Sequence, residues 1–96
     1  MGSYALSREA DADIEHIAEA SLQQWGVTRA EEYTLGLHQT FLMLAEFPDL
    51  GRDARHIRPG YRSMETASHS IFYRKTGDGV LIVRVLHQRM DFTRHL

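Results

Sequence analysis

Several residue types are scarce or absent in the 96-residue sequence. It has no cysteine, two prolines and a single lysine, Lys75. Without cysteine there is no disulfide framework, no cysteine-based zinc site and no thiol nucleophile. No apolar run approaches the roughly 20 residues of a membrane span, and the opening residues lack the apolar segment of a signal peptide. We therefore expect a cytoplasmic protein that is not inserted in a membrane.

Motifs for several reaction classes are also missing. There is no Gly-x-Ser-x-Gly, the turn that presents a serine nucleophile. The stretch Gly77-Asp78-Gly79 lies between strand-like runs and has no helix after it, so it does not qualify as a phosphate-binding loop. Of the six histidines, only His16 has a carboxylate, Glu19, at helical spacing, which is too little for a metal site. We expect no metal and no cofactor.

The overall composition is typical of one folded domain. Hydrophobic residues make up 43% and charged residues 25% of the chain, which is too apolar for a disordered segment. A chain of this size buries roughly two-thirds of its unfolded surface around one core. We interpret residues 1–96 as a single domain.

The net charge of −2 conceals an asymmetry between the two halves. Residues 1–50 carry two basic and nine acidic side chains, whereas residues 51–96 carry nine basic and four acidic ones. Eight of those nine are arginines, whose guanidinium groups make bidentate contacts to carboxylate or phosphate, although such a run is also typical of a solvated face. Because the pI of about 6.3 is low for a phosphate-binding protein, we expect no sequence-specific nucleic-acid binding.

The first half of the chain has helical periodicity. Tyr4–Leu6 is typical of a short first strand, and Ser7 is a suitable N-cap. Apolar residues at spacings of three and four predict a helix of about 17 residues that ends at Gly26. Its buried stripe is predicted to contain Ala10, Ile14, Ile17, Ala18, Leu22 and Trp25.

A second helix is predicted directly after the first. Thr28 and Glu31 have the spacing of a capping box at its start, and Phe47-Pro48 ends it. Its inner stripe is predicted to contain Tyr33, Leu37, Phe41 and Leu44, widened by Leu35 and Leu42. With a linker of about three residues, the two helices must form an antiparallel hairpin.

After Pro59 the hydrophobic pattern becomes strand-like. Residues 48–60 are typical of an irregular, arginine-rich loop, and residues 61–67, 70–75 and 80–86 predict three strands. Short connections, including the tight turn at residues 76–79, make these strands antiparallel neighbours. The sequence thus predicts an α+β fold of the order β-α-α-β-β-β, with the helical hairpin packed on a small, mostly antiparallel sheet.

Alternation along residues 80–86 suggests a binding face. The odd-numbered residues of this run share one side, and Ile82, Arg84 and Leu86 share the other. If the odd-numbered residues face the helices, the second set stands on an uncovered face, which suits it to bind another chain. The predicted partner-binding residues are Arg62, Arg74, Ile82, Arg84, Leu86 and Arg89.

A catalytic alternative uses the same half of the chain. RNA cleavage needs a proton acceptor, a proton donor and a cation to stabilise the charge that develops on phosphorus. The candidate nuclease residues are His87, Tyr73, Arg62 and Arg84, with His69 as a second imidazole. In the alternative that we favour, Tyr73 packs in the sheet, His87 closes the last strand and Arg84 is ion-paired or binds a partner.

Segments spread along almost the whole chain carry a family resemblance. They are Tyr4–Ile14, Trp25-Gly26, Phe47-Pro48-Asp49-Leu50-Gly51-Arg52, Gly60-Tyr61-Arg62, Ile71-Phe72-Tyr73-Arg74 and Ile82–Asp91. Together, in this order, they resemble the ParE toxins of the RelE/ParE superfamily, and the stretch from Arg84 to Asp91 is the most specific.

The resemblance implies a bacterial type II toxin–antitoxin module of the kind that stabilises plasmids. It implies a ParD-like antitoxin that forms a hetero-oligomer with the toxin, and DNA gyrase as the target. Relatives of the RelE type instead cut mRNA on the ribosome, so a ribosome-dependent endonuclease is the alternative. We expect the antitoxin's C-terminal arm to fold across the hairpin and the sheet, and Arg84 to pair with one of its carboxylates.

Three features favour the non-enzymatic gyrase inhibitor over the nuclease. The pI is low for a protein that enters a phosphate-lined site, and the chain has one lysine. The segment Gln88–Phe92 after the last strand has no tyrosine, whereas the superfamily's nucleases commonly carry a catalytic Tyr or His there. For the gyrase contact, residues 52–58 and 89–96 are the candidate segments.

Overall fold

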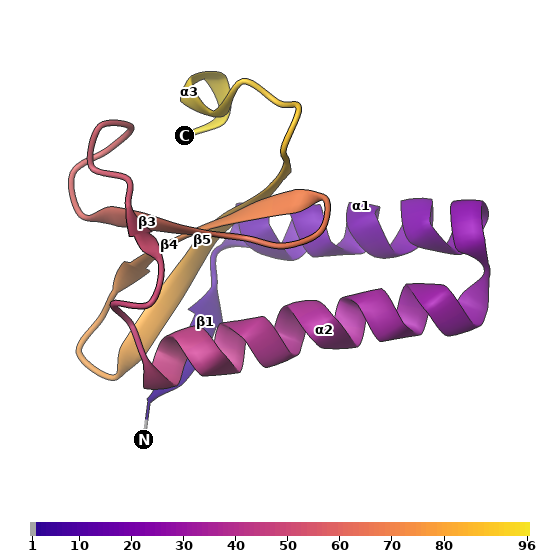
Figure 1. The fold of residues 1–96 in the computed structure, drawn as a ribbon, viewed down its shortest axis with the longest axis horizontal. Coiled ribbons are helices and arrows are strands. Elements are labelled where there is room, and N and C mark those ends of the chain that lie inside the picture. The colour runs from indigo at the N-terminus through magenta and orange to yellow at the C-terminus, as the bar shows by residue number, and fades with distance from the viewer. Residues whose placement is uncertain (1) are drawn as a thin grey trace.

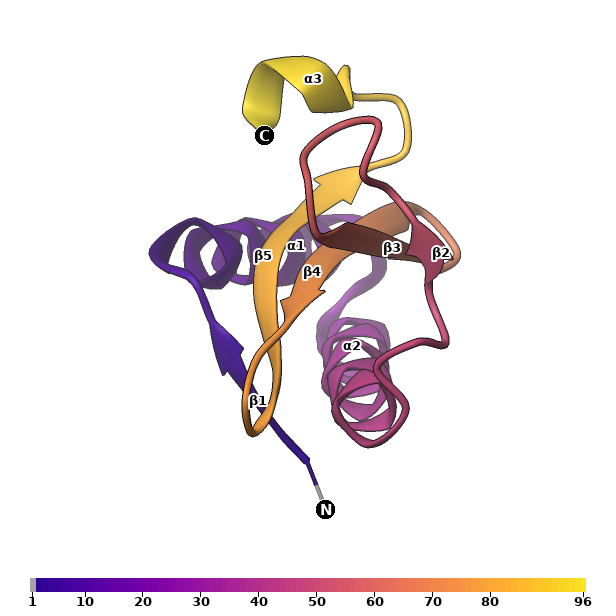
Figure 2. The same ribbon diagram turned by 90° about the vertical axis from the view of Figure 1, so that its left-hand side faces the viewer.

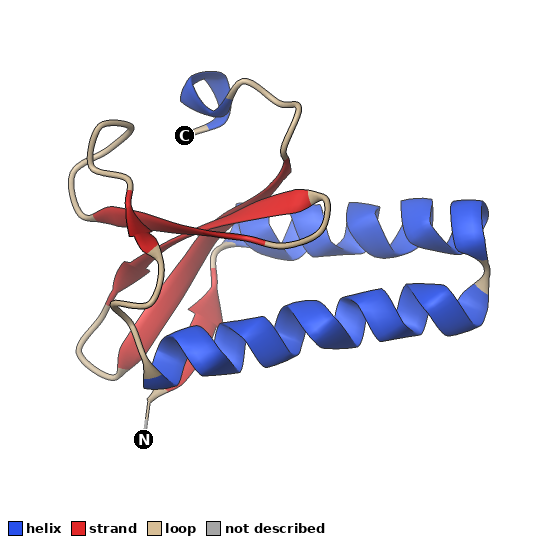
Figure 3. Ribbon diagram, in the orientation of Figure 1, coloured by secondary structure: helices blue, strands red, loops and turns tan. Residues whose placement is uncertain are grey.

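The computed structural model describes residues 2–96 and has the predicted α+β architecture. A helical hairpin packs on one face of a five-stranded sheet (Figures 1 and 3). The elements are β1 (Ser3–Leu6), α1 (Arg8–Trp25), α2 (Val27–Glu46), β2 (Arg52–Asp53), β3 (Tyr61–Glu65), β4 (His69–Lys75), β5 (Gly79–His87) and α3 (Phe92–His95). The strand order is β1-β5-β4-β3-β2, in which β1 is parallel to β5 and the other neighbours are antiparallel.

The hairpin begins and turns at residues that its local sequence specifies. The Oγ of Ser7 accepts a hydrogen bond from the Ala10 amide at 3.0 Å, which confirms the predicted N-cap of α1. Gly26 has φ of +86°, a conformation that suits glycine, and α2 follows it at once. The predicted capping box at Thr28 is therefore wrong, because α2 begins at Val27 and has no side-chain cap.

The buried stripes of the two helices are narrower than predicted. Ile14, Ile17, Leu37, Phe41 and Leu44 lie in the core, as expected. The predicted burial of four other residues is wrong, since these side chains are exposed: Leu22, Trp25, Leu35 and Leu42. The physical reason is visible in Figure 1, where the hairpin extends well past the sheet and the sheet covers only one of its sides.

A β-bulge decides which residues of β5 face the helices. The register between β4 and β5 shifts between Phe72 and Tyr73, so that Phe72 pairs with Arg84 whereas Tyr73 pairs with Ile82. The extra residue, Val83, breaks the alternation on which the face prediction relied. Ile82 consequently lies in the core beneath the hairpin, and its predicted place on the uncovered face is wrong.

The other face of the sheet is also covered. The C-terminal segment turns back over it, as Figure 2 shows for α3. The ring of Phe92 packs edge-on against that of Phe72, with the ring centroids 4.8 Å apart. Arg58 also donates a hydrogen bond to the Leu96 carbonyl at 2.6 Å. Phe72 and Leu86 are consequently buried, so the expectation that this face exposes Leu86 is wrong.

Residues 48–60 are less irregular than predicted. Arg52 and Asp53 form the short edge strand β2, which pairs with Ser63 and Arg62 of β3.

Neither long helix in residues 2–96 is apolar enough to cross a bilayer.

Candidate partner-binding surfaces

Arg84 is held inside the molecule by Asp13 of α1. Its Nε and Nη2 donate to the two carboxylate oxygens at 2.8 and 2.9 Å, a bidentate ion pair. The side chains of Arg84 and Asp13 are 19% and 12% exposed. The hydrogen bond to Asp13 raises the pKa of Arg84. Arg84 also donates to the His95 carbonyl at 2.9 Å, so it joins α1, β5 and the C-terminal segment.

Asp13 and Ser7 also complete the free edge of β5. The parallel partner β1 ends opposite Ile82. Beyond that point, the Ser7 hydroxyl donates to the Val83 carbonyl at 2.6 Å, and Asp13 accepts the Val85 amide at 3.0 Å. Two side chains near the start of α1 thus supply hydrogen bonds that a neighbouring strand would otherwise make. Buried backbone N–H and C=O groups need such partners. The sequence analysis treated Asp13 as an acidic residue of the opening turns and missed this role.

Arg62 fastens the turn between α2 and β2. Its Nη2 donates to the carbonyls of Gly51 and Asp49 at 2.6 and 3.1 Å, while its buried Nε has no hydrogen-bond partner within residues 2–96. Lys75 binds the Asp49 carboxylate on the same turn and lowers the pKa of Asp49 by this hydrogen bond. The guanidinium of Arg62 therefore hydrogen-bonds mainly to backbone carbonyls of its own chain.

Tyr73 is the buried anchor of the same turn. Its hydroxyl donates to the Pro48 carbonyl at 2.8 Å and accepts the Gly51 amide at 2.9 Å. The backbone approaches the phenol so closely that a Cβ at position 51 would lie 2.4 Å from the hydroxyl oxygen, which explains the glycine. The Tyr73 side chain has no exposed surface, and its hydroxyl already has two partners.

The four candidate nuclease residues do not meet around one open space. Arg62 and Tyr73 are paired neighbours on the helix side of the sheet, where they bind the turn at residues 48–51. Arg84 pairs with Phe72 on the opposite side and binds Asp13. His87 is exposed at the end of β5, where its ring lies 5.4 Å from that of His69.

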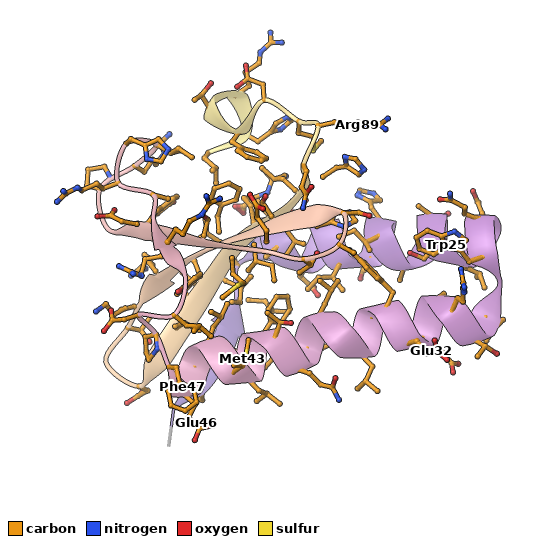
Figure 4. The ribbon with its side chains drawn as sticks, viewed as in Figure 1. Trp25, Glu32, Met43, Glu46, Phe47 and Arg89 are labelled. Atoms are coloured by element: carbon orange, nitrogen blue, oxygen red, sulfur yellow. The ribbon has the colours of Figure 1, made fainter. Side chains whose placement is uncertain are left out.

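Arg74 and Arg89 differ from the arginines described above. Both are exposed, and within the described part of the chain neither has a carboxylate at salt-bridge distance. Figure 4 shows Arg89 projecting from the connection between β5 and α3. Of the six predicted partner-binding residues, these two have free charged groups, whereas Ile82 and Leu86 are buried and Arg62 and Arg84 are bound internally.

The hairpin exposes an apolar groove that the sequence analysis did not predict. Leu22 of α1 lines it together with Val27 and Leu35 of α2, and its volume is about 460 Å³. Leu35 is 58% exposed. The sequence contained a sign of this groove, because α2 has apolar residues on more than one side. The sheet can bury only one side of such a helix, so another apolar side stays exposed.

A second group of exposed apolar side chains lies at the other end of α2. Met43, Phe47 and Leu50 follow one another at spacings of four and three, and Phe47 is 58% exposed. Figure 4 shows Met43 and Phe47 with Glu46 at this end of the helix. Large exposed side chains grouped in this way are typical of protein-binding surfaces.

Residues 4–92 match the family model described as "ParE toxin of type II toxin-antitoxin system, parDE". The chain belongs to the ParE toxin family. It is 46% identical over 94 residues to Toxin ParE1 of Mycobacterium tuberculosis, covering 97% of this chain and 96% of the relative. It is 45% identical over 96 residues to Toxin ParE1 of Caulobacter vibrioides, covering 100% and 99%. These relatives make it a ParE toxin of a type II toxin–antitoxin system.

A solved structure shares the fold of this ParE chain. It is titled "Chromosomal ParDE TA system from P. aeruginosa" and superposes with a TM-score of 0.75, covering 91% of this chain and 96% of its own. The sequence identity is 22%, so the likeness concerns the architecture. It confirms the predicted helical hairpin on a mostly antiparallel sheet.

Proposed function

We propose that this ParE toxin acts in the cytoplasm by binding DNA gyrase, without catalysing a reaction of its own. The observation that carries the proposal is the internal use of Arg62, Tyr73 and Arg84, because a nuclease would need these groups directed at a substrate. Family membership supports the choice of target, since ParE-like toxins are known for trapping gyrase with cleaved DNA.

The antitoxin is a ParD-like protein in this proposal. Its arm folds over the exposed apolar side chains of the hairpin, among them Leu22, Leu35 and Phe47, and forms a hetero-oligomer with the toxin. Free arginines such as Arg74 supply the contacts to its carboxylates. This assignment moves the antitoxin's main contact from the sheet face to the hairpin, because the sheet face is covered by the C-terminal segment.

Gyrase inhibition is tested with purified toxin and plasmid DNA. The toxin should block supercoiling and leave linear DNA after detergent and protease treatment, and toxin premixed with its antitoxin should do neither. Normal supercoiling with toxin in stoichiometric excess contradicts the proposal. Primer extension on mRNA from expressing cells gives the opposite readout, because discrete codon-linked cuts that disappear in His87→Ala would establish the nuclease.

The gyrase contact is assigned to residues 52–58 and to the segment after β5. Arg55 in the first region is exposed and forms a surface ion pair with Asp53, and Arg89 in the second region is exposed. Arg89→Ala and Arg55→Ala should each weaken the supercoiling block, whereas Arg8→Ala at the start of α1 serves as an exposed control. Equal inhibition by all three variants would place the gyrase contact elsewhere.

A further inference from the structure

A pocket of about 490 Å³ lies between α1, the strand ends at His69 and His87, and the segment that follows β5. Its size suits a small ligand. Two of its residues have roles already described: Asp13 binds Arg84, and Arg89 belongs to the proposed gyrase contact. Its charged and aromatic lining residues are Asp13, His16, Trp25, His69, His87 and Arg89.

Hydrogen bonds at Nδ1 orient the two imidazoles. The Nδ1 of His69 lies 2.6 Å from the Tyr33 hydroxyl, and the Nδ1 of His87 accepts the Arg89 amide at 3.1 Å. With Nδ1 accepting, a neutral ring carries its proton on Nε2. The two Nε2 atoms have no hydrogen-bond partner among residues 2–96, and the rings lie 5.4 Å apart. His87 therefore offers an Nε2–H donor to a ligand, and His69 offers a second one when the Tyr33 hydroxyl donates to its Nδ1.

The charges around the pocket favour an anion. Asp13 contributes its carboxylate, but Arg84 neutralises it through the bidentate ion pair. Arg89 has no carboxylate at salt-bridge distance within the described residues, and His16 adds a third imidazole. Burial, followed by the charge of His87, lowers the pKa of His69, whereas the charge of Asp13 raises it.

An aromatic surface stands beside these donors. Trp25 lines the pocket and is 42% exposed, and its ring centroid lies 6.2 Å from that of Tyr33. Figure 4 shows Trp25 at the end of α1 and Arg89 on the connection that follows β5. An exposed indole held in place by a second aromatic ring is a platform for stacking a nucleobase.

We propose that this pocket binds a nucleotide phosphate, either of a free nucleotide or of a nucleic-acid strand, without reading its sequence. The Nε2–H groups of His69 and His87 and the guanidinium of Arg89 donate to the phosphate oxygens, and Trp25 stacks on the base. This site is separate from the apolar surface of the hairpin, and it does not depend on gyrase being the target.

The single tryptophan of the chain provides the measurement. Adenosine 5′-monophosphate should quench the fluorescence of Trp25 saturably, and adenosine without phosphate should bind at least about ten-fold more weakly, the effect of losing about 1.4 kcal/mol of phosphate contacts.

Variants of exposed residues distinguish binding at the phosphate site from a nonspecific change in Trp25 fluorescence. His87→Gln and Arg89→Gln should each weaken binding by about ten-fold. His56→Gln, an exposed histidine outside this pocket, is the matched control and should bind normally. Thermal unfolding of each variant shows that the fold is retained.

The source of the phosphate follows from a second titration. A short single-stranded DNA that binds more tightly than the mononucleotide, with affinity that falls as salt rises, assigns the site to nucleic acid. Equal or weaker binding of the DNA assigns it to a free nucleotide. The proposal is overturned if neither ligand quenches, if adenosine binds as well as its monophosphate, or if a short acidic peptide competes as well as the nucleotide.

Discussion

The two halves of this toxin differ in how their side chains are used. The second half is rich in arginine, yet Arg62 and Arg84 bind carbonyls and a carboxylate of their own chain. The acidic hairpin, by contrast, exposes large apolar side chains such as Leu35 and Phe47, each 58% exposed. Charge composition alone therefore does not show which arginines are free to bind a partner, because Arg62 and Arg84 are used within the chain. A side chain is available to a partner when it stays exposed after folding and has no partner within its own chain.

Arg84→Ala provides the most severe test of this contrast. We expect it to lower the free energy of unfolding by about 3 kcal/mol, because it leaves the largely buried Asp13 carboxylate unpaired. Urea denaturation measures the change. The double variant Asp13→Ala/Arg84→Ala should lose less free energy of unfolding than the two single variants lose together.

Arg74→Ala is the matched control for that variant. Its guanidinium is exposed, with no salt bridge in the described part of the chain, so the stability change should stay within about 0.5 kcal/mol. Equal losses in both arginine variants would mean that Arg84 has no special structural role.

Tyr73→Phe tests the anchoring of the turn at residues 48–51. We expect a loss of about 1–2 kcal/mol, because the Gly51 amide and the Pro48 carbonyl each lose the phenol as a partner while the ring still fills its site. Urea denaturation again measures it. Tyr61→Phe on the neighbouring strand, where the side chain is only partly buried, should change stability less. A neutral Tyr73→Phe would show that the turn holds without the phenol.

His69 should give the toxin a modest pH dependence. Burial and the charge of His87 lower its pKa below the ordinary value of 6.5, so the unfolded chain binds more protons than the folded one. Stability is therefore complete above 6.5 and falls as the pH drops from 6.5 towards the folded pKa. Unfolding free energies measured between about pH 7.5 and about pH 5.5 should decline less in His69→Gln than in the parent chain.

The control for this pH series is His56→Gln, which should keep the decline of the parent chain because His56 is exposed. If His69→Gln and the parent chain had the same slope, another group would be responsible for it.

Leu35→Ser should have the smallest effect on stability and still impair binding. Because Leu35 is exposed in the hairpin groove, unfolding should change by less than about 0.5 kcal/mol, whereas antitoxin affinity should fall at least about ten-fold. Gln39→Ser, also exposed on α2, is the control. An unchanged dissociation constant for Leu35→Ser would remove the groove from the antitoxin interface.

Much of the fold could be predicted because it depends on local signals. Ser7, Gly26 and Phe47-Pro48 mark helix boundaries that the structure confirms within a residue or two. The tight turn at residues 76–79 similarly joined two correctly predicted strands. The candidate site was predicted less well, since its residues were assigned to faces by strict alternation, and the bulge at Val83 moved Ile82 into the core.

The sequence by itself determined the helical hairpin, the strands and the ParE family, because caps, periodicity and ordered motifs are properties of neighbouring residues. The tertiary structure alone decided which arginines are free and which apolar side chains stay exposed. The reason is distance along the chain: Arg84 and Asp13 are 71 residues apart. A long-range contact of this kind has no periodic signature, so it follows from how the hairpin and the sheet pack together.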